Sequence, residues 1–156
     1  MAQETIADGL ISDRASLIEY LESGCKPRSE WGIGTEHEKI GYHLSDLSPL
    51  SYGGTNGIRA MLQGLERFGW KPILEGDNII GLTMEGQSIS LEPGGQFELS
   101  GAILKNIHET CAEVNSHLSQ VREVASDLKV GFIGIGMQLK WGREQIPVMP
   151  KQRYDI

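Results

Sequence analysis

The chain has 156 residues, a net charge of −7 and a hydrophobic share of 39%. This length and composition predict a single globular domain over residues 1–156, with its own core and no internal boundary. The acidic balance excludes nucleic acid as an expected partner, because phosphate binding needs a basic surface. Since no apolar run reaches the ~18 residues of a membrane span and the first residues lack the features of a signal or transit peptide, we expect a cytoplasmic protein without a membrane partner.

Three elements are predicted in the first half of the chain. Residues 13–23 are expected to form a helix that Ser12 or Asp13 can cap and Gly24 can end. A strand candidate follows within residues 31–42. After a loop rich in Ser, Pro, Gly and Asn, apolar residues three and four positions apart predict a second helix over residues 58–68.

In the second half the hydrophobic period changes from helical spacing to two. Residues 78–83, 87–92 and 95–101 alternate as strands do, and the segments "MEGQ" and "PGG" between them are typical of turns. A long helix over residues 103–128 follows, and then "KVGFIGIGMQLKW" predicts a buried strand. Hairpins dominate over crossovers, so the expected fold class is α+β, a mainly antiparallel sheet with helices on one face.

The long helix should pack on the apolar face of the sheet. Apolar positions along it recur at steps of three, four and seven. The predicted contact residues are Ile107, Val114, Leu118 and Val121 on the helix, and Ile89, Leu91, Phe97 and Leu99 on the strands.

The segment "GTEHEKIGYHL" places two glutamates on one face of the first strand. Glu36 and Glu38 are two residues apart, and strand side chains alternate between faces. In the predicted hairpin, Glu92 and Glu98 also share the polar face. If these strands pair, four carboxylates converge, and like charges placed side by side destabilise a sheet. Lys39 should point away from them.

Two explanations of the carboxylates remain open. Each glutamate taken alone is most simply a solvated side chain. Taken together they indicate a divalent cation, since uncompensated carboxylates this close would repel each other. The two cysteines, Cys25 and Cys111, have no CxxC spacing, so neither zinc nor a disulfide framework is expected. Oxygen ligands favour Mg²⁺ or Mn²⁺, which proteins commonly hold together with nucleotide phosphates.

Several blocks of the sequence resemble one enzyme family over nearly the whole chain. They are "WGIGTEHEKIGY", "ILEGDNIIGL", "QSISLEPGGQFELSGA", "TCAEVNSHL", "GFIGIGMQLKW" and "IPVMPKQRYDI". They are similar to glutamate–cysteine ligases, also called γ-glutamylcysteine synthetases, of the plant and proteobacterial type. The resemblance implies ATP-dependent joining of the glutamate γ-carboxylate to cysteine through a γ-glutamyl phosphate, the first step of glutathione synthesis. It also implies a fold similar to the catalytic domain of glutamine synthetase, of which this chain would be the N-terminal part.

The resemblance assigns roles to particular residues. It implies that Glu36, Glu38, Glu92 and Glu98 are metal and substrate ligands. Lys151 and Arg153 are candidates to bind a phosphate or carboxylate, because a guanidinium matches both in shape. An exposed basic loop is an equally good explanation of these two. No residue is assigned as a catalytic acid, base or nucleophile, and ATP enters as co-substrate with Mg²⁺ or Mn²⁺.

The chain departs from the family in two respects. Family members are far longer, and Gln152 stands where they usually have glycine. We therefore expect the isolated chain to be inactive, and unpaired sheet edges could lead to a homodimer. Two alternatives stay open: another carboxylate–amine ligase of the same fold, and a truncated, non-catalytic binding module.

Overall fold

The computed structural model describes residues 11, 13–138 and 140–154. A six-stranded sheet with the order β2-β3-β4-β5-β1-β6 forms its centre, and every neighbouring pair of strands is antiparallel. The strands are β1 (Glu36–His43), β2 (Lys71–Glu75), β3 (Asn78–Met84), β4 (Gln87–Leu91), β5 (Phe97–Ser100) and β6 (Val130–Ile133). The predicted α+β class with a mainly antiparallel sheet is confirmed.

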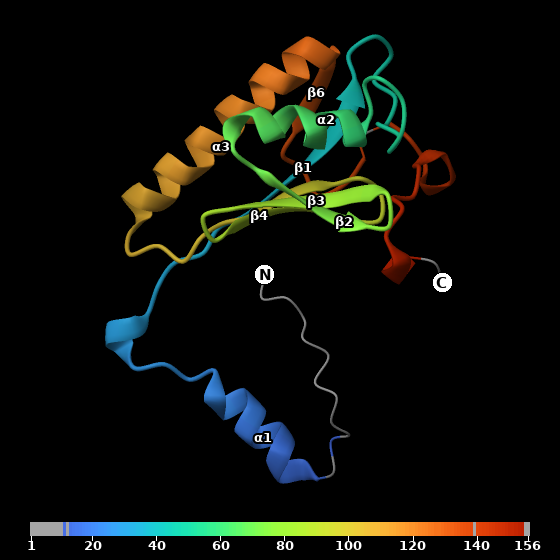
Figure 1. Ribbon diagram of the computed structural model, residues 1–156. Helices are drawn as coiled ribbons and strands as arrows, with labels where there is room; N and C mark the ends of the chain where they lie inside the picture. Colours follow the sequence, from blue (N-terminus) through green and yellow to red (C-terminus); the bar gives the residue numbers. More distant parts are fainter. Residues whose placement is uncertain (1–10, 12, 139, 155–156) are drawn as a thin grey trace.

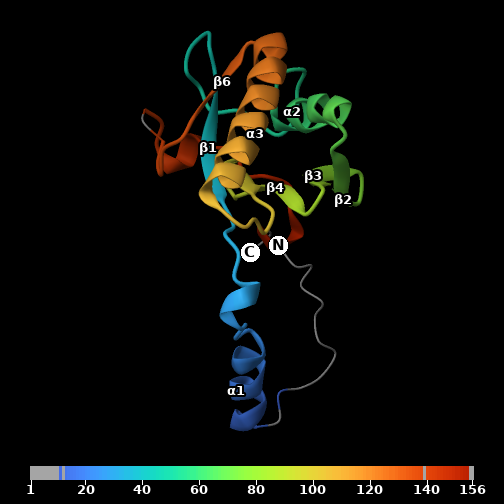
Figure 2. The ribbon, with the colours of Figure 1, turned by 90° about the vertical axis from the view of Figure 1, so that its left-hand side faces the viewer.

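Within the described residues, three α-helices accompany the sheet. They are α1 (Arg14–Ser23), α2 (Ile58–Leu65) and α3 (Ile107–Leu128). Helices α2 and α3 lie together on one side of the strands, whereas α1 lies apart from the sheet in both views (Figures 1 and 2). In the part of the chain that the structure describes, none of the helices is long and apolar enough to cross a membrane.

Helix α1 forms as predicted but buries none of its residues. The Asp13 carboxylate accepts a hydrogen bond from the Ser16 backbone N–H, so this residue is the N-cap. The apolar stripe of the helix remains exposed, with 48% of Leu17 and 74% of Leu21 accessible to solvent. The helix is therefore stabilised by its cap and by local hydrogen bonds, and not by contact with the core.

The core lies between the sheet and α2. The strand positions predicted to face inward, Ile89, Leu91, Phe97 and Leu99, have no exposed surface. One side of α2 meets them in the same apolar cluster through Ile58, Met61, Leu62 and Leu65. The alternation of the meander thus predicted correctly which side chains enter the core, and the opposite face of the strands is left for polar groups.

Helix α3 buries Val121 as predicted, but the rest of its buried side differs from the predicted one. It begins at Ile107, where the Asn106 side chain caps it, and Ile107 itself is 63% exposed. Leu118 is only partly covered. The buried positions are Thr110, His117, Val121, Val124 and Ala125. The buried stripe therefore includes a threonine and a histidine, and a pattern of apolar residues could not identify it.

The two edges of the sheet also differ from the prediction. Strand β2 was not predicted. It contains Pro72, and a proline is accepted here because β2 is an edge strand. The strand expected over "KVGFIGIGMQLKW" ends at Ile133. The residues after it leave the sheet. Two pockets lie between these residues and β1. Ile135 and Trp141 line one of them together with Ile40 and Tyr42, and Gln138 lines both together with Ile40.

Helices α2 and α3 meet closely at Gly64. A Cβ atom at this position would lie 2.4 Å from Cγ1 of Val124. We expect Gly64→Ala to lower the free energy of unfolding by ~1–3 kcal/mol through overpacking, although alanine is the better helix former by up to ~1 kcal/mol. Urea denaturation of the chain measures this.

The neighbouring exposed position provides the matched control. Gln63→Ala should leave stability nearly unchanged, since this side chain points to solvent. Adding Val124→Ala to Gly64→Ala should recover part of the loss relative to the sum of the single changes. If Gly64→Ala were stabilising, the close contact between the helices would be refuted.

Candidate functional site

Three adjacent strands place polar side chains in rows on the sheet face opposite α2 and α3, and two of them, β1 and β5, contribute carboxylates. In the middle row Ser90 of β4, Glu98 of β5 and Glu38 of β1 are cross-strand partners. In the next row Ser88, Ser100 and Glu36 correspond in the same way. We call Glu36, Glu38 and Glu98 the carboxylate face. The structure thus brings together three of the four predicted glutamates, with Glu38 and Glu98 directly opposed.

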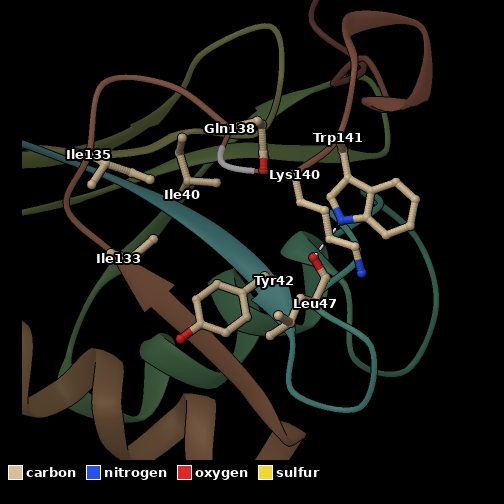
Figure 3. Close-up of a pocket in the computed structure, with 8 residues that line it drawn as sticks. All are labelled: Ile40, Tyr42, Leu47, Ile133, Ile135, Gln138, Lys140 and Trp141. Atoms are coloured by element: carbon tan, nitrogen blue, oxygen red, sulfur yellow. Dashed lines mark hydrogen bonds between the residues drawn. The ribbon is translucent and has the colours of Figure 1, made fainter.

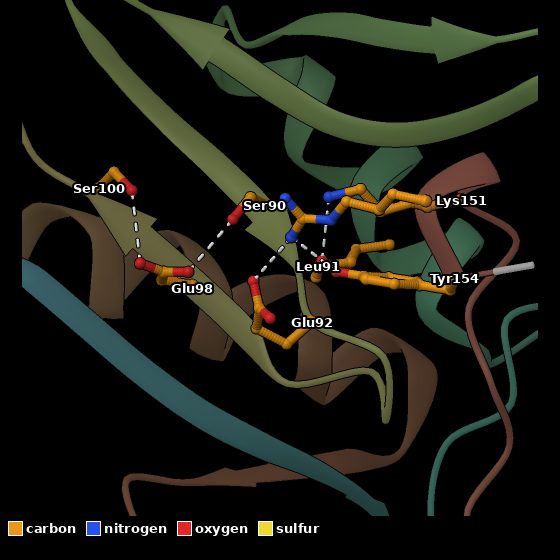
Figure 4. A network of polar contacts seen from close by, with 8 residues as sticks. Ser90, Leu91, Glu92, Glu98, Ser100, Lys151 and Tyr154 are labelled. Carbon is orange, nitrogen blue, oxygen red and sulfur yellow. Dashed lines mark hydrogen bonds and ion pairs between the residues drawn. The ribbon is translucent and has the colours of Figure 1, made fainter. Parts of the chain in front are cut away.

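Serine hydroxyl groups flank Glu98 on both sides. Ser90 Oγ donates to Oε2 of Glu98 at 3.3 Å and Ser100 Oγ to Oε1 at 3.5 Å (Figure 4). Both serines are buried, whereas Glu98 is half-buried and Glu38 is exposed. These long hydrogen bonds orient the Glu98 carboxylate along its strand and leave its oxygens capable of accepting further ligands.

Glu92 lies beyond the end of β4 and pairs with a cation instead of joining the rows. Its Oε1 is 3.1 Å from Nη2 of Arg153. The same nitrogen of Arg153 donates to Oη of Tyr154 at 2.7 Å. Both charged side chains are partly exposed, so this ion pair contributes little to stability. Its effect is to hold a guanidinium beside the polar face of β4 and β5.

Lys151 is buried and donates a hydrogen bond to the end of β4. Only 6% of the residue is exposed, and Nζ donates to the Leu91 carbonyl at 3.1 Å, next to the Tyr154 hydroxyl, which donates to the same oxygen at 2.8 Å (Figure 4). Burial, followed by the nearby Arg153, lowers the pKa of Lys151. The structure therefore shows Lys151 and Tyr154 anchoring the C-terminal segment to β4, and the anion-binding role of Lys151 and Arg153 stays a prediction.

Lys39 lies on the helix-covered side of β1, behind the carboxylate face. It points away from the glutamates as the alternation predicted, but it is only 1% exposed. Its Nζ donates to the carbonyls of His37 at 3.1 Å and Phe97 at 3.2 Å, and lies 5.7 Å from the centre of the Phe97 ring. Burial lowers the pKa of Lys39 to about 8, although the charge of Glu98 acts in the opposite direction.

Two pockets adjoin the carboxylate face, where the chain after β6 passes Ile40 of β1. The first, of about 190 Å³, is lined mainly by apolar side chains (Figure 3). Its lining residues are Ile40, Tyr42, Leu47, Ile133, Ile135, Gln138, Lys140 and Trp141. The Trp141 indole donates to the Leu47 carbonyl at 2.7 Å, which closes one side of it.

The second pocket, of about 280 Å³, shares Ile40 and Gln138 with the first. It also includes Gln96, two residues before Glu98, and Arg143. The Oε1 atom of Gln96 is buried and has no hydrogen-bond partner among the described residues. An open pocket with a guanidinium therefore lies next to the carboxylates, and its size suits a small molecule.

The donor set of the carboxylate face suits a hard divalent cation. Its ligands would be carboxylate oxygens with serine hydroxyls beside them, which is the chemistry that Mg²⁺ and Mn²⁺ prefer. Among residues 11, 13–138 and 140–154, no three His, Cys, Asp or Glu side chains form a group that could hold a metal. The metal-binding role of Glu36, Glu38, Glu92 and Glu98 therefore stays a prediction.

Two contributors to the site were not predicted from the sequence. Tyr154 anchors the C-terminal segment, and Lys39 bridges the strands that carry the opposed glutamates. The burial of Lys39 could be inferred from its place on a strand face whose other positions are covered. That inference requires knowing that α3 covers this face of β1.

Comparison with known proteins identifies the family. Residues 32–156 match the model of glutamate–cysteine ligase family 2 (GCS2). Over 144 residues, or 92% of this chain, it is 58% identical to "Glutamate--cysteine ligase, chloroplastic" of Medicago truncatula and to the protein of the same name from Arabidopsis thaliana. It is 56% identical to "Glutamate--cysteine ligase A, chloroplastic" of Oryza sativa subsp. japonica. The matching segment spans only 27–29% of the length of these relatives.

These comparisons correct one expectation and confirm another. The expected cytoplasmic location is wrong, since the names of these relatives place them in the chloroplast. A start lacking transit-peptide features was a poor guide, because the chain corresponds to a limited part of its relatives. The resemblance drawn from the sequence blocks is confirmed, and the chain belongs to glutamate–cysteine ligase family 2.

Proposed function

We propose that this chain contributes the carboxylate face of an ATP-dependent ligase that joins the γ-carboxylate of glutamate to the amine of cysteine. The product, γ-glutamylcysteine, is the first intermediate of glutathione synthesis. Family membership supports the reaction class. The observation that carries the proposal is the direct opposition of Glu38 and Glu98 across β1 and β5 on an open sheet face. The names of the relatives support work in the plastid.

The proposed reaction proceeds in two balanced steps. An oxygen of the glutamate γ-carboxylate forms a bond to the γ-phosphorus of ATP as the bond to the ADP oxygen breaks, which gives γ-glutamyl phosphate. The cysteine amine then attacks the acyl carbon, inorganic phosphate leaves, and the amine loses a proton. Because an anion attacks an anion in the first step, the site must supply positive charge.

Side chains of this chain meet part of this demand. Glu36, Glu38 and Glu98 would hold Mg²⁺ or Mn²⁺, which when bound neutralises phosphate charge. Arg153, held beside the face by Glu92 and Tyr154, can orient a phosphate or carboxylate through its guanidinium. The pocket of about 280 Å³ beside Gln96 provides space for a small substrate.

A graft into a longer relative tests the proposal. The matching 144-residue segment of the Medicago truncatula protein is replaced by that of this chain, giving what we call the grafted enzyme. We expect the grafted enzyme to form γ-glutamylcysteine with ATP, Mg²⁺ and cysteine, because the parts of the site absent from the segment are restored. The isolated chain should form none.

Chromatographic detection of γ-glutamylcysteine and of released phosphate provides the measurement. Assays with alanine and 2-aminobutyrate in place of cysteine show whether cysteine is the preferred amine. A folded graft without activity, or one that prefers another amine, would contradict the proposed reaction. Turnover by the isolated chain would contradict the view that it needs further parts.

A further inference from the structure

Lys39 bonds to the backbone at the two points that carry the opposed glutamates. The His37 carbonyl belongs to the peptide bond that precedes Glu38, and the Phe97 carbonyl to the one that precedes Glu98. Nζ of Lys39 donates to both, at 3.1 and 3.2 Å. One ammonium group therefore bridges β1 and β5 directly behind the glutamate pair.

The same ammonium is placed to offset the repulsion between Glu38 and Glu98. Two carboxylates that face each other across antiparallel strands destabilise the pairing. A positive charge within the protein interior is screened less than one at the surface. The charge of Lys39 therefore interacts with Glu98, the partner of Glu38 across the two strands, through the thickness of the sheet.

The other basic groups near Lys39 do not replace it in this role. His37 and His117 are on the same side of the sheet, and burial, followed by the charge of Lys39, lowers the pKa of both. Arg122 lines the adjacent pocket of about 500 Å³ but is exposed. Lys39 is thus the buried cation of this region in the described part of the chain.

We propose that Lys39 is a positioning residue that clamps the backbone of Glu38 and Glu98 and serves as their internal counter-charge when no metal is bound. The inference rests on the proposed function only for the purpose of this role, which is to keep Glu38 and Glu98 opposed so that they can bind a cation. Its physical content concerns the metal-free fold, so it can fail or hold independently of ligase activity.

A double-mutant cycle on the isolated chain without metal tests the inference. The variants are Lys39→Met, Glu98→Gln and their combination, and the unfolding equilibrium constant is measured by urea denaturation. With Lys39 present, Glu98→Gln should change this constant little. In the Lys39→Met background, Glu98→Gln should lower the unfolding equilibrium constant about fivefold more than it does with Lys39 present. The reason is that the repulsion between Glu38 and Glu98 is then no longer offset.

The control cycle combines Lys39→Met with Glu123→Gln. This second change removes an exposed carboxylate of α3 that is paired with Arg67. This cycle should be additive. If Lys39→Met alone does not fold, Lys39→Met with Glu98→Gln should recover the fold. Additivity in the Lys39–Glu98 cycle, or an unfolded Lys39→Met that Glu98→Gln does not rescue, would show that Lys39 only fills space and satisfies carbonyls.

Discussion

In the grafted enzyme, Glu38→Gln should lower turnover at least about 100-fold while leaving the fold intact. The substitution keeps the size of the side chain and removes one of two opposed charges. If the pair helps to hold a metal, losing one ligand misplaces the transferring phosphoryl group, and small misplacements have effects of this size. Stability of the metal-free protein should stay equal or rise by at most ~1 kcal/mol. Initial rates against Mg²⁺ concentration and thermal melts measure both.

The matched control for this substitution is Glu123→Gln, an exposed glutamate far along α3. It should leave turnover and its Mg²⁺ dependence unchanged. Lys39 points away from the glutamates, but Lys39→Gln is unsuitable as a control because Lys39 is buried and hydrogen-bonded. Near-normal rates and metal dependence in Glu38→Gln would mean that the opposed glutamates are an ordinary solvated pair.

His117→Leu should stabilise the chain, and the gain should grow as the pH falls. His117 is 1% exposed, and neither ring nitrogen has a hydrogen-bond partner among the described residues. Burial, followed by the charges of Lys39 and His37, lowers its pKa to about 3 from the usual 6.5 of a histidine. Between these two pH values the unfolded chain binds a proton that the folded chain does not. The free energy of unfolding therefore decreases as the pH is lowered. This group alone should contribute ~1.4 kcal/mol per pH unit within that window.

Leucine removes both the titration and the unpaired polar atoms. The free energy of unfolding at pH 7 should therefore rise by ~1–3 kcal/mol, and its decrease towards pH 4 should become shallower. His117→Asn separates the two effects, because it removes the titration and keeps a buried polar group. It should flatten the pH dependence without the gain at pH 7. Urea denaturation at pH 7, 5.5 and 4 provides the data. If both variants kept the pH profile of the original chain, His117 would take up its proton in the folded chain over the same pH range as in the unfolded chain, and the expected lowering of its pKa would be refuted.

The local sequence determined most of the elements, though not the edge strand β2, and the two faces of the meander. Alternation over residues 87–91 and 97–100 depends on neighbours two positions apart, so the inward set and the outward serines and Glu98 could be predicted. The shared face of Glu36 and Glu38 was predictable for the same reason. Helix α2 was predictable because its buried positions are all apolar and regularly spaced.

Only the tertiary structure decided which of these residues meet. Glu38 faces Glu98 because β1 pairs with β5, a strand some 60 positions later, and no local pattern fixes that partner or its register. The same packing buries Lys39 and His117, whose side chains suggest solvent when considered alone. A polar side chain enters the interior when the surrounding elements close over it and supply hydrogen bonds or neutral neighbours, as β5 does for Lys39. Composition and periodicity report what each segment prefers; the charge balance of the site depends on contacts between segments far apart in the chain.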